Sequence, residues 1–114
     1  MSATHDFHQR VISDAGAAVR GLTVALGERL GLYRALAEAG PLTPAALAER
    51  TAIHPRYAEE WLHAQLSAGY VERDPDTGAY SLPADHAPVL ADPNAITFAA
   101  GFFTALKALY GTED

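Results

Sequence analysis

Apolar side chains recur at helical spacing along the N-terminal part of the chain. From about Phe7 to Leu30 they return every three or four residues, which predicts a helical segment with one apolar face. The residues assigned to that face are Val11, Ala15, Val19, Leu22 and Leu26. A second short helix is expected from Leu32 to Ala39, ended by Gly40 and Pro41. Residues 7–39 are therefore assigned to N-terminal helices.

Three glycines, Gly16, Gly21 and Gly27, interrupt the first helical pattern. Each lowers helix stability by about 1 kcal/mol relative to alanine. The pattern allows two interpretations: a weak helix that breaks near Gly21, or a helix whose glycines let another backbone approach closely. The second interpretation predicts a contact between subunits along this helix.

Two capping sequences mark a pair of helices within residues 43–69. Thr43-Pro44 and His54-Pro55 each place proline at the first helical position, after a residue that can cap the helix. Gly69 stands where a left-handed C-terminal cap is expected. Two helices joined by a short turn form a helix-turn-helix.

The hydrophobic period changes after this helix pair. Residues 70–82 contain two short strand-like stretches separated by the turn sequence Asp74-Pro75-Asp76-Thr77-Gly78. A hairpin directly after a helix-turn-helix is the order of a winged helix. Asp92 and Pro93 predict the start of a last helix, residues 93–110, that is apolar nearly all round and therefore buried on every face.

These elements define the expected fold class. The fold is mainly α: one winged helix-turn-helix domain, residues 1–114, with additional N-terminal and C-terminal helices and one β-hairpin wing. A last helix that is apolar on all sides needs a cover that so small a domain does not easily supply. A partner chain or a further domain is expected to provide it.

Charge bears on what such a fold can bind. The 114-residue chain has a net charge of −6, with 14 acidic and eight basic side chains. Acidic side chains also outnumber basic ones in both elements that would face DNA. They are Glu59 and Glu60 against Arg56 in the second helix of the pair, and Asp74 and Asp76 against Arg73 in the wing. Repulsion from phosphates would oppose docking, so DNA binding is not expected.

Familiar catalytic motifs are absent from the sequence. No glycine-rich phosphate loop follows a strand, and neither a Gly-x-Ser-x-Gly nor a His-Glu-x-x-His sequence occurs. The chain has no cysteine, which excludes disulfides and thiol catalysis. His5 and His8 could share a helix face as metal ligands, but no third ligand is near, so no metal is expected.

Targeting signals are also absent. No stretch of about 18 apolar residues predicts a membrane span, and the polar N-terminus does not resemble a signal peptide. The sequence therefore predicts a cytoplasmic protein without a membrane partner.

Aromatic side chains suggest one small-molecule site. Its candidate lining residues are Tyr33, Phe98, Phe102, Phe103 and Tyr110. Aromatic residues at helical spacing more often belong to a core or an interface, and that alternative stays open.

Several short motifs occur in a characteristic order and spacing. They are Leu30-Gly31-Leu32-Tyr33-Arg34-Ala35-Leu36, Gly40-Pro41-Leu42-Thr43-Pro44, Leu47-Ala48-Glu49-Arg50-Thr51, His54-Pro55-Arg56-Tyr57, Glu60-Trp61-Leu62, Ala68-Gly69-Tyr70-Val71-Glu72 and Tyr80-Ser81-Leu82-Pro83. Together they resemble the N-terminal winged-helix domain of class I S-adenosylmethionine-dependent methyltransferases, chiefly the bacterial and actinobacterial subgroup.

The resemblance implies a structural role rather than catalysis by this domain. In such families it forms an intertwined homodimer, chiefly through the N-terminal helices, and helps to close the pocket for a small-molecule substrate. A C-terminal Rossmann-like domain binds S-adenosylmethionine. No residue here corresponds to the cofactor-binding loop, so this chain alone is expected to bind no cofactor.

Three functional hypotheses follow. The first is a non-catalytic dimerisation and substrate-lid domain, whose catalytic half is expected beyond Asp114 or on a separate chain. The alternative is a winged-helix transcriptional regulator that binds DNA or a small ligand. The third is a stand-alone adaptor or small-molecule binder that uses the aromatic last helix.

Overall fold

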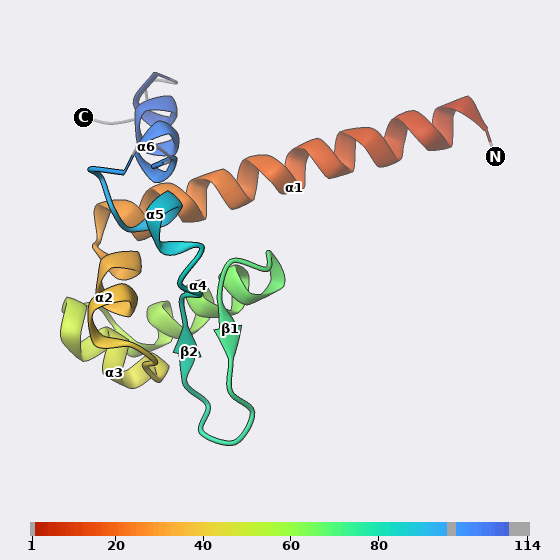
Figure 1. The fold of residues 1–114 in the computed structure, drawn as a ribbon. Helices are drawn as coiled ribbons and strands as arrows, with labels where there is room; N and C mark the ends of the chain where they lie inside the picture. Colours follow the sequence, from red (N-terminus) through yellow and green to blue (C-terminus); the bar gives the residue numbers. More distant parts are fainter. Residues whose placement is uncertain (1, 96–97, 110–114) are drawn as a thin grey trace.

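The computed structural model describes residues 2–95 and 98–109 (Figure 1). Over that part of the chain the elements follow in the order α1, α2, α3, α4, β1, β2, α5, α6. The architecture is mainly helical with one two-stranded hairpin, which confirms the predicted winged-helix class.

Helix α1 is continuous over 27 residues, Ala3–Arg29. Ser2 caps it, because its hydroxyl oxygen accepts a hydrogen bond from the His5 backbone N–H at 3.0 Å. The helix thus begins earlier than Phe7 and does not break at Gly21. At 1.5 Å per residue it is about 40 Å long, and its N-terminal part extends away from the other elements (Figure 1).

Helix α2, Leu32–Ala39, follows α1 after a sharp turn at Gly31. Gly31 has φ of +74°, a backbone conformation that favours glycine. The observed bounds of α2 agree with the sequence prediction.

Helices α3, Pro44–Thr51, and α4, Pro55–Ser67, form the helix-turn-helix. The Thr43 hydroxyl oxygen accepts from the Ala46 N–H at 3.2 Å, and His54 Nδ1 accepts from the Arg56 N–H at 3.1 Å. Both predicted caps are therefore confirmed.

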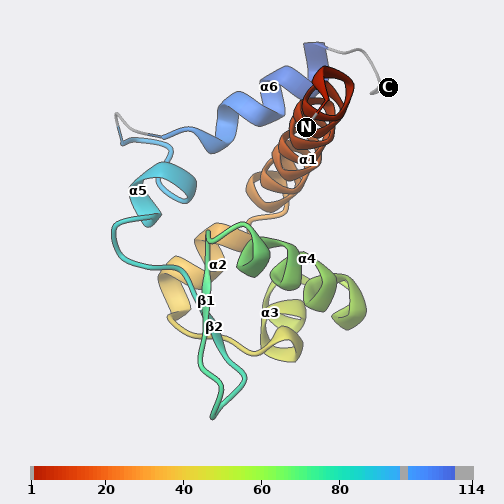
Figure 2. The same cartoon turned by 90° about the vertical axis from the view of Figure 1, so that its right-hand side faces the viewer.

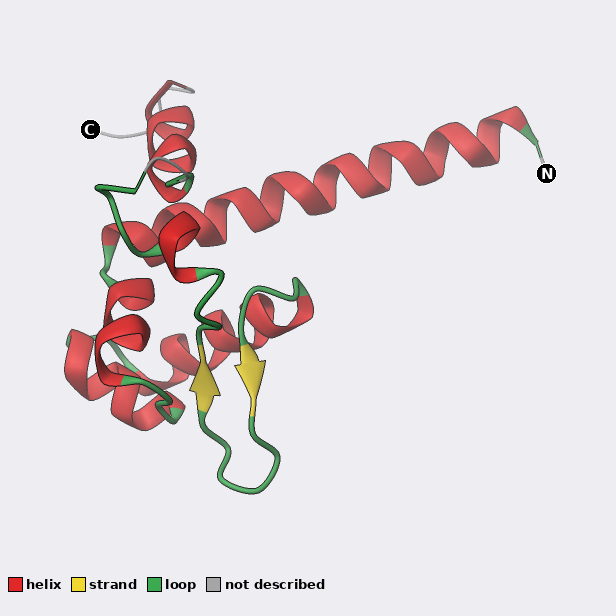
Figure 3. Cartoon of the chain, viewed as in Figure 1, coloured by secondary structure: helices red, strands yellow, loops and turns green. Residues whose placement is uncertain are grey.

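The wing consists of β1, Glu72–Arg73, and β2, Tyr80–Ser81, which pair antiparallel (Figure 3). Tyr80 also exchanges two backbone hydrogen bonds with Leu42, at 2.8 and 2.9 Å. Since Leu42 precedes α3, this bridge ties the wing to the helix pair. The strands are shorter than the sequence pattern suggested.

The C-terminal region differs from the prediction. A short helix α5, Ala87–Leu90, is followed by α6, Ala100–Leu109, so the last helix does not begin at Pro93. Asp92 instead closes a local turn, with its Oδ1 accepting from the Asn94 N–H at 3.0 Å. The chain does not continue from this turn as a helix, and the Ala99 N–H instead donates to the Val89 carbonyl oxygen at 2.8 Å. Predictions for Ile96 and Tyr110 lie outside the described residues.

The core gathers between α1, α2, α3, α4 and the wing. Its largest fully buried side chains are Tyr33, Tyr80, Leu32, Leu36, Leu47, Leu62, Gln65 and Val24. Only the C-terminal end of α1 enters this core, while α6 lies beside α1 on its other side (Figure 2). The winged helix therefore holds a long helix by one end.

Candidate functional site

The exposed face of α1 is the first candidate site. Among the predicted interface residues, Val11 is 47 %, Val19 60 % and Leu22 51 % exposed. Ala15 is also exposed, whereas Leu26 is half-buried. Exposed side chains of this size in one row are unusual on a monomer and mark contact surfaces.

The structure adds two residues to this face that sequence reasoning missed. Phe7 is 61 % and Ile12 54 % exposed, and both lie beside Val11 on α1. Phe7 stands four residues before Val11, so the helical spacing could have included it. We call Phe7, Val11, Ile12, Val19 and Leu22 the α1 apolar face.

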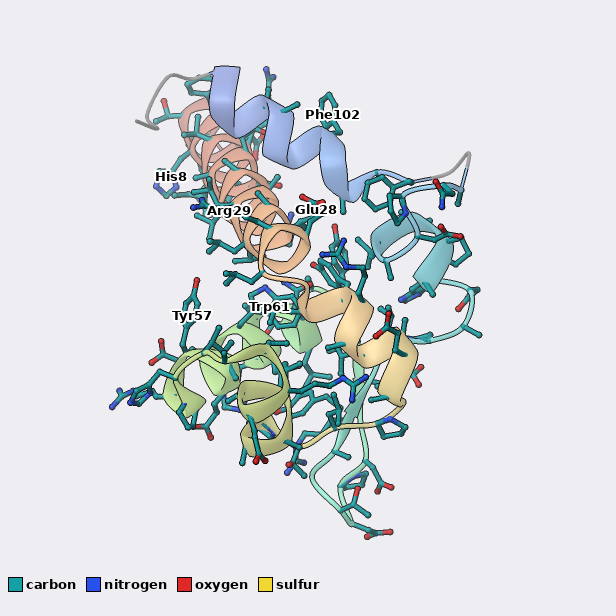
Figure 4. All side chains as sticks on the ribbon, turned by 90° about the vertical axis from the view of Figure 1, so that its left-hand side faces the viewer. His8, Glu28, Arg29, Tyr57, Trp61 and Phe102 are labelled. Atoms are coloured by element: carbon teal, nitrogen blue, oxygen red, sulfur yellow. The ribbon has the colours of Figure 1, made fainter. Side chains whose placement is uncertain are left out.

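The proposed aromatic pocket residues occupy different environments. Tyr33 is 1 % exposed in the core, where its ring packs edge-on against Trp61 with centroids 5.0 Å apart. Phe98 is half-buried against the core. Phe102 is 63 % exposed on the outer side of α6 (Figure 4). Phe103 belongs to α6, but its side chain lies outside the described part.

The Tyr33 hydroxyl has a defined role in the core. It donates a hydrogen bond to Gln65 Oε1, and burial raises the pKa of the Tyr33 phenol well above its usual range, with a smaller contribution from Tyr70. The phenol therefore stays protonated and remains a donor at physiological pH.

A hollow of about 340 Å³ lies between the end of α4 and α5. Its lining residues are Ala68, Gly69, Tyr70, Asp85, His86, Val89, Leu90 and Ala99. His86 Nδ1 lies 2.8 Å from the Tyr70 carbonyl oxygen. Because a carbonyl only accepts, Nδ1 carries the proton and the imidazole orientation is fixed. Neither Tyr33 nor Phe102 lines this hollow.

The face that a repressor would turn toward DNA carries an ion pair. Arg56 Nε lies 3.2 Å from Glu60 Oε2 on the exposed side of α4. Glu59, His63 and Arg73 line a second hollow, of about 570 Å³, between α4 and the wing. Glu60 thus stands beside Arg56, a cation that would have to contact phosphates, and the absence of DNA binding stays a prediction from the sequence.

The described residues contain neither a metal-binding cluster nor a membrane-spanning helix. No group of three or more His, Asp or Glu side chains there is placed to hold a metal ion. His8 projects from α1 (Figure 4). Within the same residues, no helix is both long and apolar enough to cross a membrane.

The capped helix pair, the hairpin that follows it and their shared core define a winged helix-turn-helix domain. Residues 17–92 match the family model of the Rv2258c-like winged HTH domain, and the chain belongs to that family. No match to this chain is found among curated proteins.

Solved structures with a similar fold include several methyltransferases. The mitomycin 7-O-methyltransferase MmcR is similar with a TM-score of 0.75 and 23 % identity, over 95 % of this chain and 34 % of that one. Human N-acetylserotonin methyltransferase in complex with SAM gives a TM-score of 0.73 and 21 % identity, over 94 % and 32 %. CalO1, a methyltransferase of calicheamicin biosynthesis in its SAH-bound form, gives 0.68 and 20 %, over 91 % and 30 %.

The chain spans about a third of the length of each of these methyltransferases. The predicted similarity in fold to the winged-helix domain of S-adenosylmethionine-dependent methyltransferases is confirmed.

Proposed function

We propose that this chain is a dimerisation and substrate-lid domain of a small-molecule S-adenosylmethionine-dependent methyltransferase and that it is not catalytic alone. The observation that carries the proposal is the α1 apolar face, on a domain whose fold recurs in methyltransferases. A homodimer would bury the same face of both copies.

The size of the α1 apolar face indicates how much free energy it can contribute to dimerisation. Burying one half-exposed side chain of this kind contributes about 1 kcal/mol. Five such residues on each of two copies contribute roughly 10 kcal/mol, against about 4–15 kcal/mol lost on association. The α1 face alone is therefore marginal, and we expect other surfaces to join the interface.

The lid part of the proposal concerns α6. Phe102 places an aromatic ring on the outer side of this helix, 63 % exposed. In the proposed enzyme, α6 lies next to a catalytic domain that is separate from the residues described here, and Phe102 contributes to the wall of the substrate pocket. Phe98 is proposed to support that wall, and Tyr33 is proposed to support it from within the core.

S-adenosylmethionine is proposed for the parent enzyme and not for this domain. Cofactors of this kind bind at a glycine-rich turn between a parallel strand and a helix. The strands in the described ranges are the two short antiparallel strands of the wing. The residues present therefore do not fit the cofactor. A cytoplasmic location stays a prediction from the sequence.

Sedimentation of the wild-type chain and one double variant tests dimerisation. Val19→Asp/Leu22→Asp places two charges on the α1 apolar face and is expected to yield monomers, because paired helices would bury those carboxylates. Leu66→Asp is the matched control, since Leu66 is 38 % exposed on α4 away from that face, and it should remain dimeric. A wild-type chain that stays monomeric at high concentration would contradict the proposal.

Two binding measurements separate the proposal from its alternatives. Calorimetry with S-adenosylmethionine should detect no binding to this chain, and tight binding would contradict the non-catalytic assignment. A gel shift at low salt should show no complex with DNA. Sequence-selective binding that weakens with added salt would instead favour a transcriptional regulator.

A further inference from the structure

We propose that Thr23, Gly27, Tyr33, Trp61 and Gln65, here called the α1 clamp, fix the direction in which α1 leaves the winged helix. The clamp thereby sets where the α1 apolar face points and how two copies can pair. Only the effect on pairing rests on the proposed function, because the direction of α1 is a property of one protomer.

Hydrogen bonds form the first part of the clamp. Gln65 is 0 % exposed, and its Oε1 accepts from the Tyr33 hydroxyl. Its Nε2 donates to Thr23 Oγ1 at 2.9 Å, and the Thr23 hydroxyl donates in turn to the Arg20 carbonyl at 2.8 Å. This chain of bonds runs from the buried Tyr33–Gln65 pair to the half-buried Thr23, and a network whose members are all satisfied permits few other arrangements. It links α1 to α2 and α4.

A further hydrogen bond reaches the backbone of Thr23. Trp61 projects from α4 toward the end of α1 (Figure 4). Its Nε1–H donates to the Thr23 carbonyl oxygen at 2.9 Å. Thr23 is therefore held through both its side chain and its backbone, which restricts the rotation of α1 about its own axis.

Close packing at Gly27 forms the third part. A Cβ atom at this position would lie 2.5 Å from Trp61 Cζ2 and 2.6 Å from Tyr33 Cε2. Only glycine lets the α1 backbone approach the two rings this closely. The rings thus limit the tilt of α1, one turn beyond the hydrogen bonds at Thr23.

The length of α1 amplifies small changes at the clamp. About 20 residues precede Thr23 in the helix, which corresponds to roughly 30 Å. A tilt of about 10° at the clamp would therefore move the N-terminal end by roughly 5 Å, close to one helical turn. Such a shift would move the apolar side chains out of register with a second copy.

The clamp and the apolar face occupy different stretches of the helix. All five residues of the α1 apolar face precede Thr23 in α1, and all five remain exposed in the folded chain. Contacts at the clamp therefore leave the apolar face accessible while fixing its orientation. Helix α6 also packs against α1, so the test must change the clamp and leave α6 intact.

Because the sequence contains no cysteine, two introduced cysteines can carry spin labels at chosen positions, and the distance between the labels reports the direction of α1. Asp14→Cys on α1 and Glu49→Cys on α3 replace exposed residues and accept one spin label each. Dilution with unlabelled protein leaves only distances within one protomer. The wild-type background is expected to give one narrow distance distribution.

Three substitutions remove the side-chain hydrogen bonds of Tyr33, Gln65 and Thr23, keep the core apolar and filled, and leave the Trp61 bond to the Thr23 carbonyl in place. Thr23→Val/Tyr33→Phe/Gln65→Leu replaces donors and acceptors together, which tends to preserve folding. We expect circular dichroism to show retained helix and the distance distribution to widen at least twofold. Thr51→Val is the control, because Thr51 also donates to a helix carbonyl, that of Leu47, but lies outside the clamp. An unchanged width in the folded triple variant would overturn the proposal.

A conservative pair keeps the test decisive if the triple variant does not fold. Thr23→Ser retains the hydroxyl and should keep the narrow distribution, whereas Thr23→Val should widen it. Equal widths in these two variants would contradict a role for the hydrogen bonds.

Sedimentation then tests whether the clamp affects dimerisation. The clamp variants should weaken dimerisation at least tenfold, although their apolar face is intact. A widened distribution with unchanged dimerisation would overturn the link to pairing. A monomeric wild-type chain would contradict the proposed function, and the distance widths would still decide whether the clamp directs α1.

Discussion

Gly27 and Gly16 occupy the same helix but face opposite constraints. Gly27 lies against two aromatic rings, whereas among the described side chains a Cβ at Gly16 would meet only the Arg20 guanidinium, at 3.5 Å. Alanine favours helix formation over glycine by about 1 kcal/mol wherever space allows. The sequence pattern treats the two positions alike, and only the packing separates them.

Alanine substitutions at these two glycines should therefore change stability with opposite signs. Gly27→Ala is expected to lower the free energy of unfolding by about 1–3 kcal/mol, because the new methyl group overpacks the core. Gly16→Ala should raise it by about 0.5–1 kcal/mol. Urea denaturation followed by circular dichroism measures both, and destabilisation by Gly16→Ala would show that this glycine, too, is in close contact.

Tyr33 predicts a dependence of stability on alkaline pH. Burial raises the pKa of its phenol in the folded state, while in the unfolded chain it ionises near pH 10. The unfolded state thus releases its proton first. The stability is complete below about pH 10 and declines above it, by up to about 1.4 kcal/mol per pH unit.

Tyr33→Phe should make that decline shallower. Tyr57→Phe is the control, since Tyr57 is 37 % exposed on α4. Chemical denaturation between pH 8 and roughly pH 11, where a phenol ionises, gives the slopes. Equal slopes for wild type and Tyr33→Phe would show that the phenol is not protected by the core.

For individual helices, local capping sequences predicted the ends correctly where no long-range contact competed with them. Thr43 and His54 cap the helices that follow them, and α2 has the predicted bounds. Asp92-Pro93 carries the same type of signal, yet the last helix begins at Ala100. There the Asp92 side chain bonds to the Asn94 N–H, and the Ala99 N–H donates to the Val89 carbonyl at 2.8 Å. A helix running from Pro93 would lose this long-range bond, which no local pattern contains.

The candidate site was predictable only in part. The periodicity identified the row of Val11, Val19 and Leu22, because exposed and buried apolar faces have the same helical spacing. The periodicity could not distinguish these exposed residues from the buried Tyr33. Tyr33 is held in the core by its hydrogen bond to Gln65, which lies 32 residues away in the sequence. The interactions that hold α1 join distant segments, and they became visible only in the folded chain.

The whole molecule is a compact winged helix with a long helix held at one end (Figure 1). Most of the stability of a helix in a protein comes from packing of its apolar face, and the three glycines weaken α1 further. Its N-terminal part should therefore depend on a second copy for protection. This predicts that backbone amides of residues 3–20 exchange slowly at high protein concentration and faster on dilution.

Hydrogen exchange measured by mass spectrometry checks this expectation. In Val19→Asp/Leu22→Asp, residues 3–20 should exchange rapidly at every concentration, because the apolar face no longer pairs. Peptides covering Leu47 and Leu62 should keep their protection, since these side chains lie in the core of one protomer. Protection of residues 3–20 that is independent of concentration in the wild type would mean that α1 is stabilised within one chain. The apolar face would then need another partner than a second copy.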